Sequence, residues 1–137
     1  MKQNIQHTFN VIGKWGCYFL SILRLYEFVA DMEISGADII DLWERGRANN
    51  WLDRECTVLR PEKLLSYLTK DIWNVRKESA AYEPGKNEFQ ILVYKMGEHQ
   101  AHFVLADNSG KITFDPWGDS EIVRNGKLHS KRIFWRS

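Results

Sequence analysis

Hydrophobic spacing changes halfway along the chain, and this change limits the folds open to it. Over residues 16–68, hydrophobic side chains recur at helical intervals, as at Phe19, Ile22 and Leu23. Beyond residue 72 they alternate with other residues, which is typical of strands. A run of helices followed by a run of strands predicts an α+β fold, with N-terminal helices packed on a C-terminal antiparallel β-sheet.

Start and stop signals place three helices in the first half. Ser35 is suited to cap one of them, with Asp38 as an acidic partner three residues later, and Pro61 suits a first helical position. The expected helices run from residue 16 or 17 to about 31, from the cap at 35 to 49, and from 61 onward. The first is apolar nearly all round, which predicts a buried central helix.

Six segments of the second half have strand character, so we expect a sheet of five or six strands. They are residues 72–76, 89–95, 101–106, 111–114, 121–124 and 132–136. Asp107-Asn108-Ser109-Gly110 is a clear turn signal between the third and fourth segments, and Asn125-Gly126 marks a last hairpin turn.

Composition narrows the function classes. The chain has 137 residues of which 44% are hydrophobic, enough for one core, so we expect a single domain over residues 1–137. A net charge of +1 gives no global field toward nucleic acid or an anionic membrane. Two cysteines, no secretory pattern and no long apolar span predict a cytoplasmic protein. No motif for a cofactor or a metal is evident, and the sequence leaves the oligomeric state open.

Cys17 stands where the first helix should begin, directly after Gly16. A thiol at a helix N-terminus faces free amide groups and the positive end of the helix dipole, and both favour the nucleophilic thiolate. The same amides can bind an oxyanion during acyl transfer. The alternative interpretation is a small buried cysteine with a packing role.

His102 and Asp115 fall opposite each other if the hairpin has a tight turn centred on Asn108-Ser109. Opposed side chains lie within reach of an imidazole–carboxylate hydrogen bond, which would fix the histidine tautomer. The alternative is an ordinary surface pair of little energetic value.

The order cysteine, histidine, acid resembles that of papain-like cysteine hydrolases. Gly16-Cys17-Tyr18-Phe19-Leu20-Ser21 is similar to the helix start of that family, and Asp115-Pro116-Trp117-Gly118 is similar to its Asn-Ser-Trp-Gly. The strand Ala101–Leu105 with the later Asp-Pro is closest to the bacterial peptidases that cleave double-glycine leader sequences. The resemblance covers residues 13–25 and 89–136.

This resemblance implies a hydrolase that cleaves a peptide or amide bond through a thioester. Cys17 would be the nucleophile, His102 the base, and Asp115 the residue that orients His102. Asn10 and Gln6 are candidates for a second oxyanion donor beside the Cys17 amide. Two tryptophans, Trp15 and Trp117, would flank the site.

One departure keeps other functions open. The family usually has a glutamine about six residues before the cysteine, whereas this chain has Val11. A catalytically weak or inactive module that binds a protein partner is therefore an alternative, as is a cell-wall amidase or endopeptidase of the CHAP type.

Overall fold

The structure is a computed structural model that describes residues 10–13, 16–97 and 101–137. Residues 10–13 are helical, and three helices follow them: α2 (Cys17–Ala30), α3 (Gly36–Ala48) and α4 (Pro61–Thr69). The sheet follows, with strands β1 (Trp73–Ser79), β2 (Phe89–Lys95), β3 (Ala101–Ala106), β4 (Ile112–Phe114) and β5 (Lys127–Arg136), and with a short helix, α5 (Glu121–Asn125), before the last strand.

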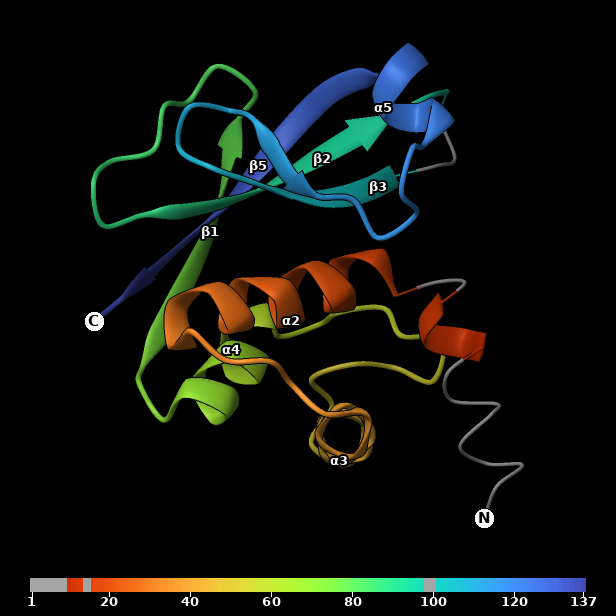
Figure 1. Cartoon of the computed structure of the whole chain (residues 1–137), viewed down its shortest axis with the longest axis vertical. Coiled ribbons are helices and arrows are strands. Elements are labelled where there is room, and N and C mark those ends of the chain that lie inside the picture. Colours follow the sequence, from red (N-terminus) through yellow and green to blue (C-terminus); the bar gives the residue numbers. More distant parts are fainter. Residues whose placement is uncertain (1–9, 14–15, 98–100) are drawn as a thin grey trace.

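These elements form a helical layer packed against an antiparallel sheet, so the predicted α+β class is confirmed. The five strands have the order β1-β5-β2-β3-β4, and each paired neighbour runs antiparallel. Helices α2, α3 and α4 lie on one side of the sheet, and α5 lies on the other (Figure 1). In the part of the chain that is described, no helix is long and apolar enough to cross a membrane.

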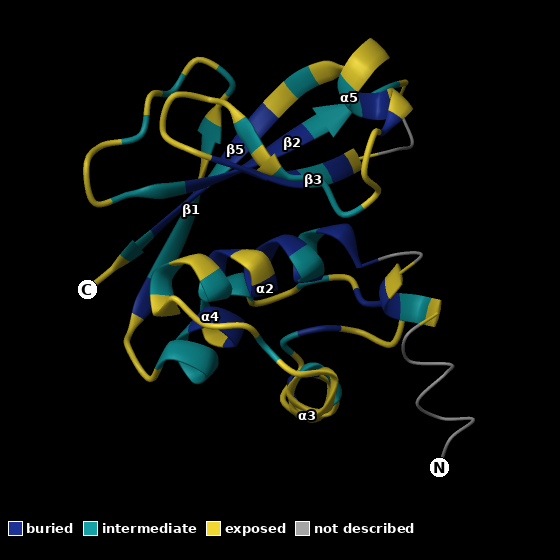
Figure 2. Cartoon of the chain, in the orientation of Figure 1, coloured by how far each residue is buried: buried dark blue, intermediate teal, exposed yellow. Residues whose placement is uncertain are grey.

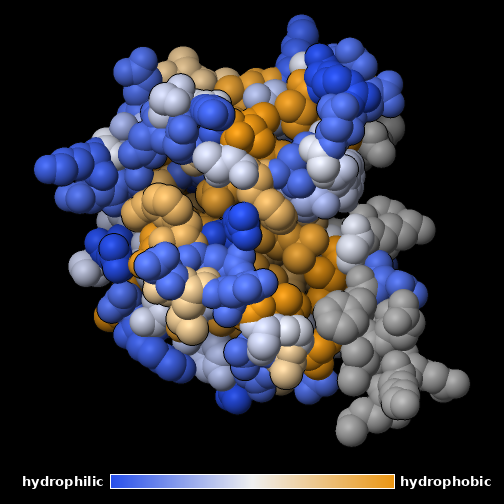
Figure 3. All heavy atoms as spheres, in the orientation of Figure 1, coloured by the Kyte–Doolittle hydropathy of each residue, from blue (hydrophilic) through white to orange (hydrophobic). Residues whose placement is uncertain are grey.

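The main hydrophobic core lies between α2 and the sheet. Phe19 and Ile22 of α2 are fully buried against a sheet face that includes Ile91 and Phe134 (Figure 2). The prediction that this helix is buried nearly all round is wrong on one side, because Phe28 is 72% exposed. Hydrophobic atoms also reach the surface between the helical layer and the sheet in Figure 3.

The expected helix signals act locally as predicted. Ser35 caps α3, since its hydroxyl oxygen accepts a hydrogen bond of 3.1 Å from the Asp38 amide. Pro61 occupies the first turn of α4, where its missing amide hydrogen costs no helical bond.

The segment that begins at Glu121 is the helix α5 and not a strand, which corrects the sequence-based prediction. Asn125-Gly126 ends this helix and makes no hairpin turn. The Gly126 amide donates to the Ile122 carbonyl, and a Cβ at Gly126 would lie 2.4 Å from that oxygen and 2.7 Å from the Lys95 carbonyl oxygen. Glycine is therefore required here by close backbone approach.

The pairing of β3 with β4 also differs from the expected register. Leu105 lies opposite Phe114 and Ala106 lies opposite Ile112, with an irregularity between the two pairs. Ile112 consequently packs with Val104 on the α5 side of the sheet. In the described part of the chain β4 pairs with no residue of β3 before Leu105, so the first half of that edge of β3 is left for other elements.

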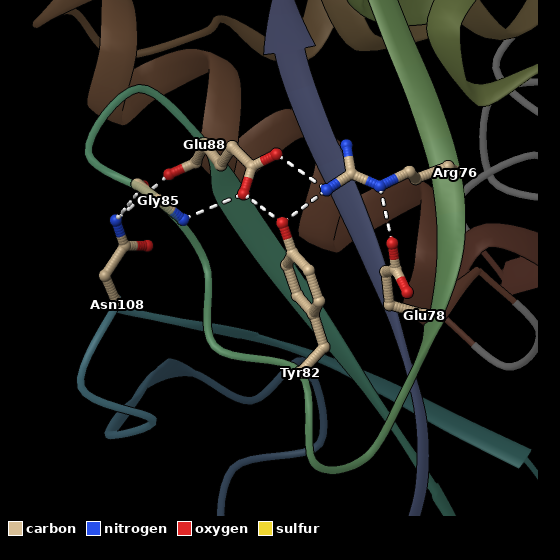
Figure 4. A network of polar contacts seen from close by, with 6 residues as sticks. All are labelled: Arg76, Glu78, Tyr82, Gly85, Glu88 and Asn108. Atoms are coloured by element: carbon tan, nitrogen blue, oxygen red, sulfur yellow. Dashed lines mark hydrogen bonds and ion pairs between the residues drawn. The ribbon is translucent and has the colours of Figure 1, made fainter.

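A polar network holds the long connection between β1 and β2 (Figure 4). Arg76 of β1 forms ion pairs of 2.7 Å with both Glu78 and Glu88, and it also contacts the Tyr82 hydroxyl. Glu88 accepts hydrogen bonds of 2.6 Å from Tyr82 and 2.8 Å from the Gly85 amide. The Glu88 carboxylate thus binds Tyr82 and Gly85 of the loop and Arg76 of β1.

The network predicts a pH-dependent contribution of Glu88 to stability. The Gly85 amide, and then the hydrogen bonds from Tyr82 and Arg76, lower the pKa of Glu88 to about 2. Glu88→Gln should therefore lower the free energy of unfolding at pH 7, and the difference from wild type should shrink as the pH falls through about 4 toward 2. Urea unfolding across this pH range checks the result.

Glu83→Gln is the matched control, because Glu83 lies on the same loop and is exposed. It should leave stability nearly unchanged at every pH. A Glu88→Gln effect of the same size at pH 3 as at pH 7 would contradict the assigned role of the carboxylate.

Candidate functional site

His102 and Asp115 form a buried pair. The His102 Nε2 atom lies 2.6 Å from Asp115 Oδ1, and the two side chains are 0% and 9% exposed. The structure thus brings these two residues together although they are not in the expected register, because the chain beyond β4 turns back toward β3. The alternative of a surface pair is wrong.

The Asp115 carboxylate is the acceptor for three groups. Besides His102, the Trp117 amide donates to Oδ1 at 2.9 Å and the Ser120 hydroxyl donates to Oδ2 at 2.8 Å. Burial raises the pKa of Asp115, but these hydrogen bonds outweigh it and the pKa lies below its usual value. Asp115 is therefore ionised at neutral pH.

An ionised acceptor fixes the histidine tautomer. Because Asp115 can only accept, Nε2 of a neutral His102 must carry the proton, and Nδ1 presents a lone pair. Nδ1 is buried and has no hydrogen-bond partner among the described residues. A buried basic nitrogen without a partner is costly in a structural role, and it is the atom a general base would use.

Trp117 covers this pair. Its ring stacks on the His102 ring with centroids 3.9 Å apart and an interplanar angle of 17°, while the side chain remains 40% exposed. The tryptophan therefore separates the imidazole from solvent on one side and limits its rotation.

Cys17 is the first residue of α2 and is buried. Gly16 precedes it as the N-cap, and its amide donates to the Ile12 carbonyl at 2.8 Å. A Cβ at Gly16 would lie 2.4 Å from that carbonyl oxygen, so only glycine lets the helical residues 10–13 approach α2 so closely.

The free edge of β3 meets α2 directly. The Ser21 hydroxyl donates to the Phe103 carbonyl at 3.2 Å, and one helical turn earlier a backbone hydrogen bond links Phe103 to the Cys17 sulfur. That hydrogen bond lowers the pKa of the thiol, so the Phe103 amide is its donor. Since this amide is joined to the carbonyl carbon of His102, the Cys17 sulfur lies beside the histidine backbone.

Burial sets the protonation of the Cys17 thiol. It raises the pKa of Cys17 more than the backbone hydrogen bonds of Phe103, Tyr18 and Cys17 itself lower it, and the Asp115 carboxylate raises it further. The prediction that the helix N-terminus would yield a lowered pKa is thus wrong for this structure. The amides converge on the sulfur as expected, but desolvation is the larger effect.

A cleft of about 470 Å³ opens beside Cys17, between the helices and the sheet. Phe103 forms part of its wall and stacks on Tyr18, with ring centroids 4.2 Å apart. His102 does not line the cleft although its neighbours Ala101 and Phe103 do. It shares the α5 side of the sheet with Val104, so it can reach Cys17 only around the edge of β3.

Of the remaining site candidates from the sequence, the described residues include Asn10. Asn10 is exposed in the helical residues 10–13, while Gln6 and Trp15 lie outside the described residues. Within the described ranges, no group of three histidine, cysteine or acidic side chains could hold a metal ion.

Sequence reasoning missed two supporting serines. Ser21, like Arg24 and Glu27, interrupts a largely apolar helix, and it lies one turn after Cys17. A hydroxyl at that spacing is a usable signal, because once buried, as it is here, it needs a hydrogen-bond partner. Ser120 carries no such signal, because its contact with Asp115 depends on how the loop after β4 folds.

The lowered pKa of Asp115 predicts how its removal affects stability. Asp115→Asn should lower the free energy of unfolding by about 1–3 kcal/mol at pH 7, because a charged acceptor of three hydrogen bonds is lost. The difference should shrink as the pH falls below about 4, where the wild-type carboxyl group also becomes protonated. Chemical unfolding at pH 7, 5 and 3 measures it.

Asp119→Asn, on the same loop and with a side chain that is 84% exposed, is the control and should have little effect. Equal effects of the two substitutions at pH 7 would show that Asp115 does not anchor His102 as described.

Comparison with known proteins identifies the family of the chain but no activity. Neither a curated protein nor a solved structure matches the chain. One family model, described as "Protein of unknown function, DUF261", matches residues 1–136. The chain therefore belongs to the DUF261 family.

Proposed function

We propose that this protein is a cysteine hydrolase of the papain-like kind that cleaves a peptide or amide bond. The observation that carries the proposal is the His102 ring, whose Nε2 is held by Asp115 while Nδ1 stays buried and unpartnered within the described chain. Cys17, which follows Gly16 at the start of α2, lies beside the Phe103 amide, the backbone group that follows His102 on the edge of β3.

Each residue then has a defined role. Cys17 is the nucleophile, His102 the general base through Nδ1, and Asp115 the positioning residue that stabilises the imidazolium. Trp117 shields the His102–Asp115 bond from water. This support comes from the residues and their geometry alone, since the DUF261 family carries no known activity.

The resting thiol is protonated, so the reaction begins with proton transfer. His102 Nδ1 takes the thiol proton as the sulfur attacks the carbonyl carbon, and the carbonyl oxygen becomes an oxyanion near the free amides of the α2 N-terminus. The imidazolium returns the proton to the leaving amine, and a thioester remains. Water, deprotonated by His102, then attacks the thioester, and the sulfur leaves as the regenerated thiol.

An inactive binding module on the same fold is the second candidate. The raised pKa of Cys17 favours it, because burial opposes the thiolate that catalysis needs. The position of His102 outside the cleft favours it as well.

The two candidates differ in how Cys17 reacts. Under the hydrolase proposal, native Cys17 should be alkylated by iodoacetamide at pH 6–8, since His102 accepts the proton that burial otherwise retains. His102→Ala should slow this reaction at pH 7 by about 10-fold or more. Peptide mapping by mass spectrometry separates Cys17 from Cys56.

His129→Ala is the matched control, because His129 is exposed on β5, and the variant should react like wild type. An identical pH profile in wild type and His102→Ala, or labelling of Cys17 only after unfolding, would exclude the hydrolase and favour the binding module.

A further inference from the structure

The cleft beside Cys17 contains cations on the sheet face that packs toward α2. Lys77 of β1 and Arg132 of β5 are a directly opposed pair, so their side chains share one face of the sheet. Both line the cleft with Cys17. The Arg132 guanidinium lies over the Phe103 ring, 5.8 Å from its centroid, which places this charge against the wall next to the thiol.

A further positive charge, Lys95, lies near this pair. Lys95, Lys77 and Arg132 all lower the pKa of His129 by charge repulsion, with Lys95 the largest cause. Lys95 and His129 line a separate pocket, so we use the name basic wall only for Lys77 and Arg132, the opposed pair in the cleft. The N-terminus of α2 adds a partial positive charge at the same cleft.

The positive charges of the basic wall are not neutralised by ion pairs with carboxylates of the described chain. Among the described residues, Lys77 and Arg132 form no ion pair, and Arg132 donates instead to the Ser130 hydroxyl at 3.0 Å. Arg76 also lines the cleft, but its guanidinium is bound to Glu78 and Glu88. Nearby carboxylates have other partners. Glu62, which acts on Tyr18, pairs with Arg60 at 3.1 Å, and Asp115 is bound to His102. Asp53, which acts on Cys56, accepts hydrogen bonds from the amides of Glu55 and Thr57.

We propose that the cleft selects an acidic peptide, whose carboxylate binds Arg132 and Lys77 while the amide to be cleaved lies at Cys17. This inference rests on the proposed function for the cleavage step, but the anion preference follows from the cleft alone. Arginine with a neighbouring lysine is well suited to a carboxylate, because the guanidinium can donate two parallel hydrogen bonds. Tyr18 and Phe103 give the rest of the peptide an apolar wall.

Two thiol reagents that differ in charge test the preference at Cys17. The rate of alkylation by iodoacetate, divided by the rate for iodoacetamide, should be about two- to tenfold higher in the native protein than in the urea-unfolded chain. This excess should fall in 0.5 M salt and should be lost in Lys77→Gln and Arg132→Gln. Lys70→Gln, which removes a charge beside a separate pocket, is the control and should retain it.

A binding measurement covers the case in which native Cys17 reacts with neither reagent. N-acetylglutamate methylamide, titrated into the 15N-labelled protein, should shift the amide signals of Phe103 and Arg132, whereas N-acetylglutamine methylamide should not. The proposal is overturned if the rate ratio equals that of the unfolded chain, if both substitutions leave it unchanged, or if a non-reacting protein binds the two ligands equally.

These outcomes are independent of catalysis. The rate ratio compares two reagents at one thiol and does not require His102 to act as a base. Loss of the ratio with retained His102 dependence would reject the acidic substrate alone, and the reverse result would reject the hydrolase alone.

Discussion

The early end of β4 is the constraint on which the rest of the candidate site depends. Because β4 pairs with β3 only at Leu105 and Ala106 in the described structure, the preceding edge of β3 is met by α2 instead of a strand. Cys17 and Ser21, one helical turn apart, take up the Phe103 backbone groups that a strand would have bound. The same early end frees Asp115 to turn toward His102.

Hydrogen bonding and burial have opposite effects on the pKa values of Asp115 and Cys17. Asp115 stays ionised because three donors outweigh its burial, whereas Cys17 stays protonated because burial outweighs its backbone hydrogen bonds. The resting thiol is then neutral, and the buried Nδ1 of His102 has no partner among the described residues. The proposed reaction therefore requires the Cys17 sulfur and Nδ1 to meet around the edge of β3.

Much of the fold was predictable because its signals are local. The cap at Ser35, the proline at the start of α4 and the alternation in β2 each act over a few residues. Glu121–Asn125 was misassigned because a five-residue segment has no clear period, and the close approach of Gly126 to the Lys95 carbonyl is a tertiary contact. The contact between His102 and Asp115 was predicted correctly, although the β3–β4 register was not. The chain after β4 brings Asp115 to His102 even though the two residues are not paired in the sheet. The pKa of Cys17 was predicted in the wrong direction, because the sequence shows a helix start but not the depth of burial.

Long-range 1H–15N NMR of histidine-labelled protein tests the central claim most directly, with His102→Ala used to assign the signal. At a pH where the ring is neutral, the account predicts a protonated Nε2 and an unprotonated Nδ1 whose resonance moves when Cys17 is alkylated. A proton on Nδ1, or a resonance that does not respond to the modified thiol, would contradict it.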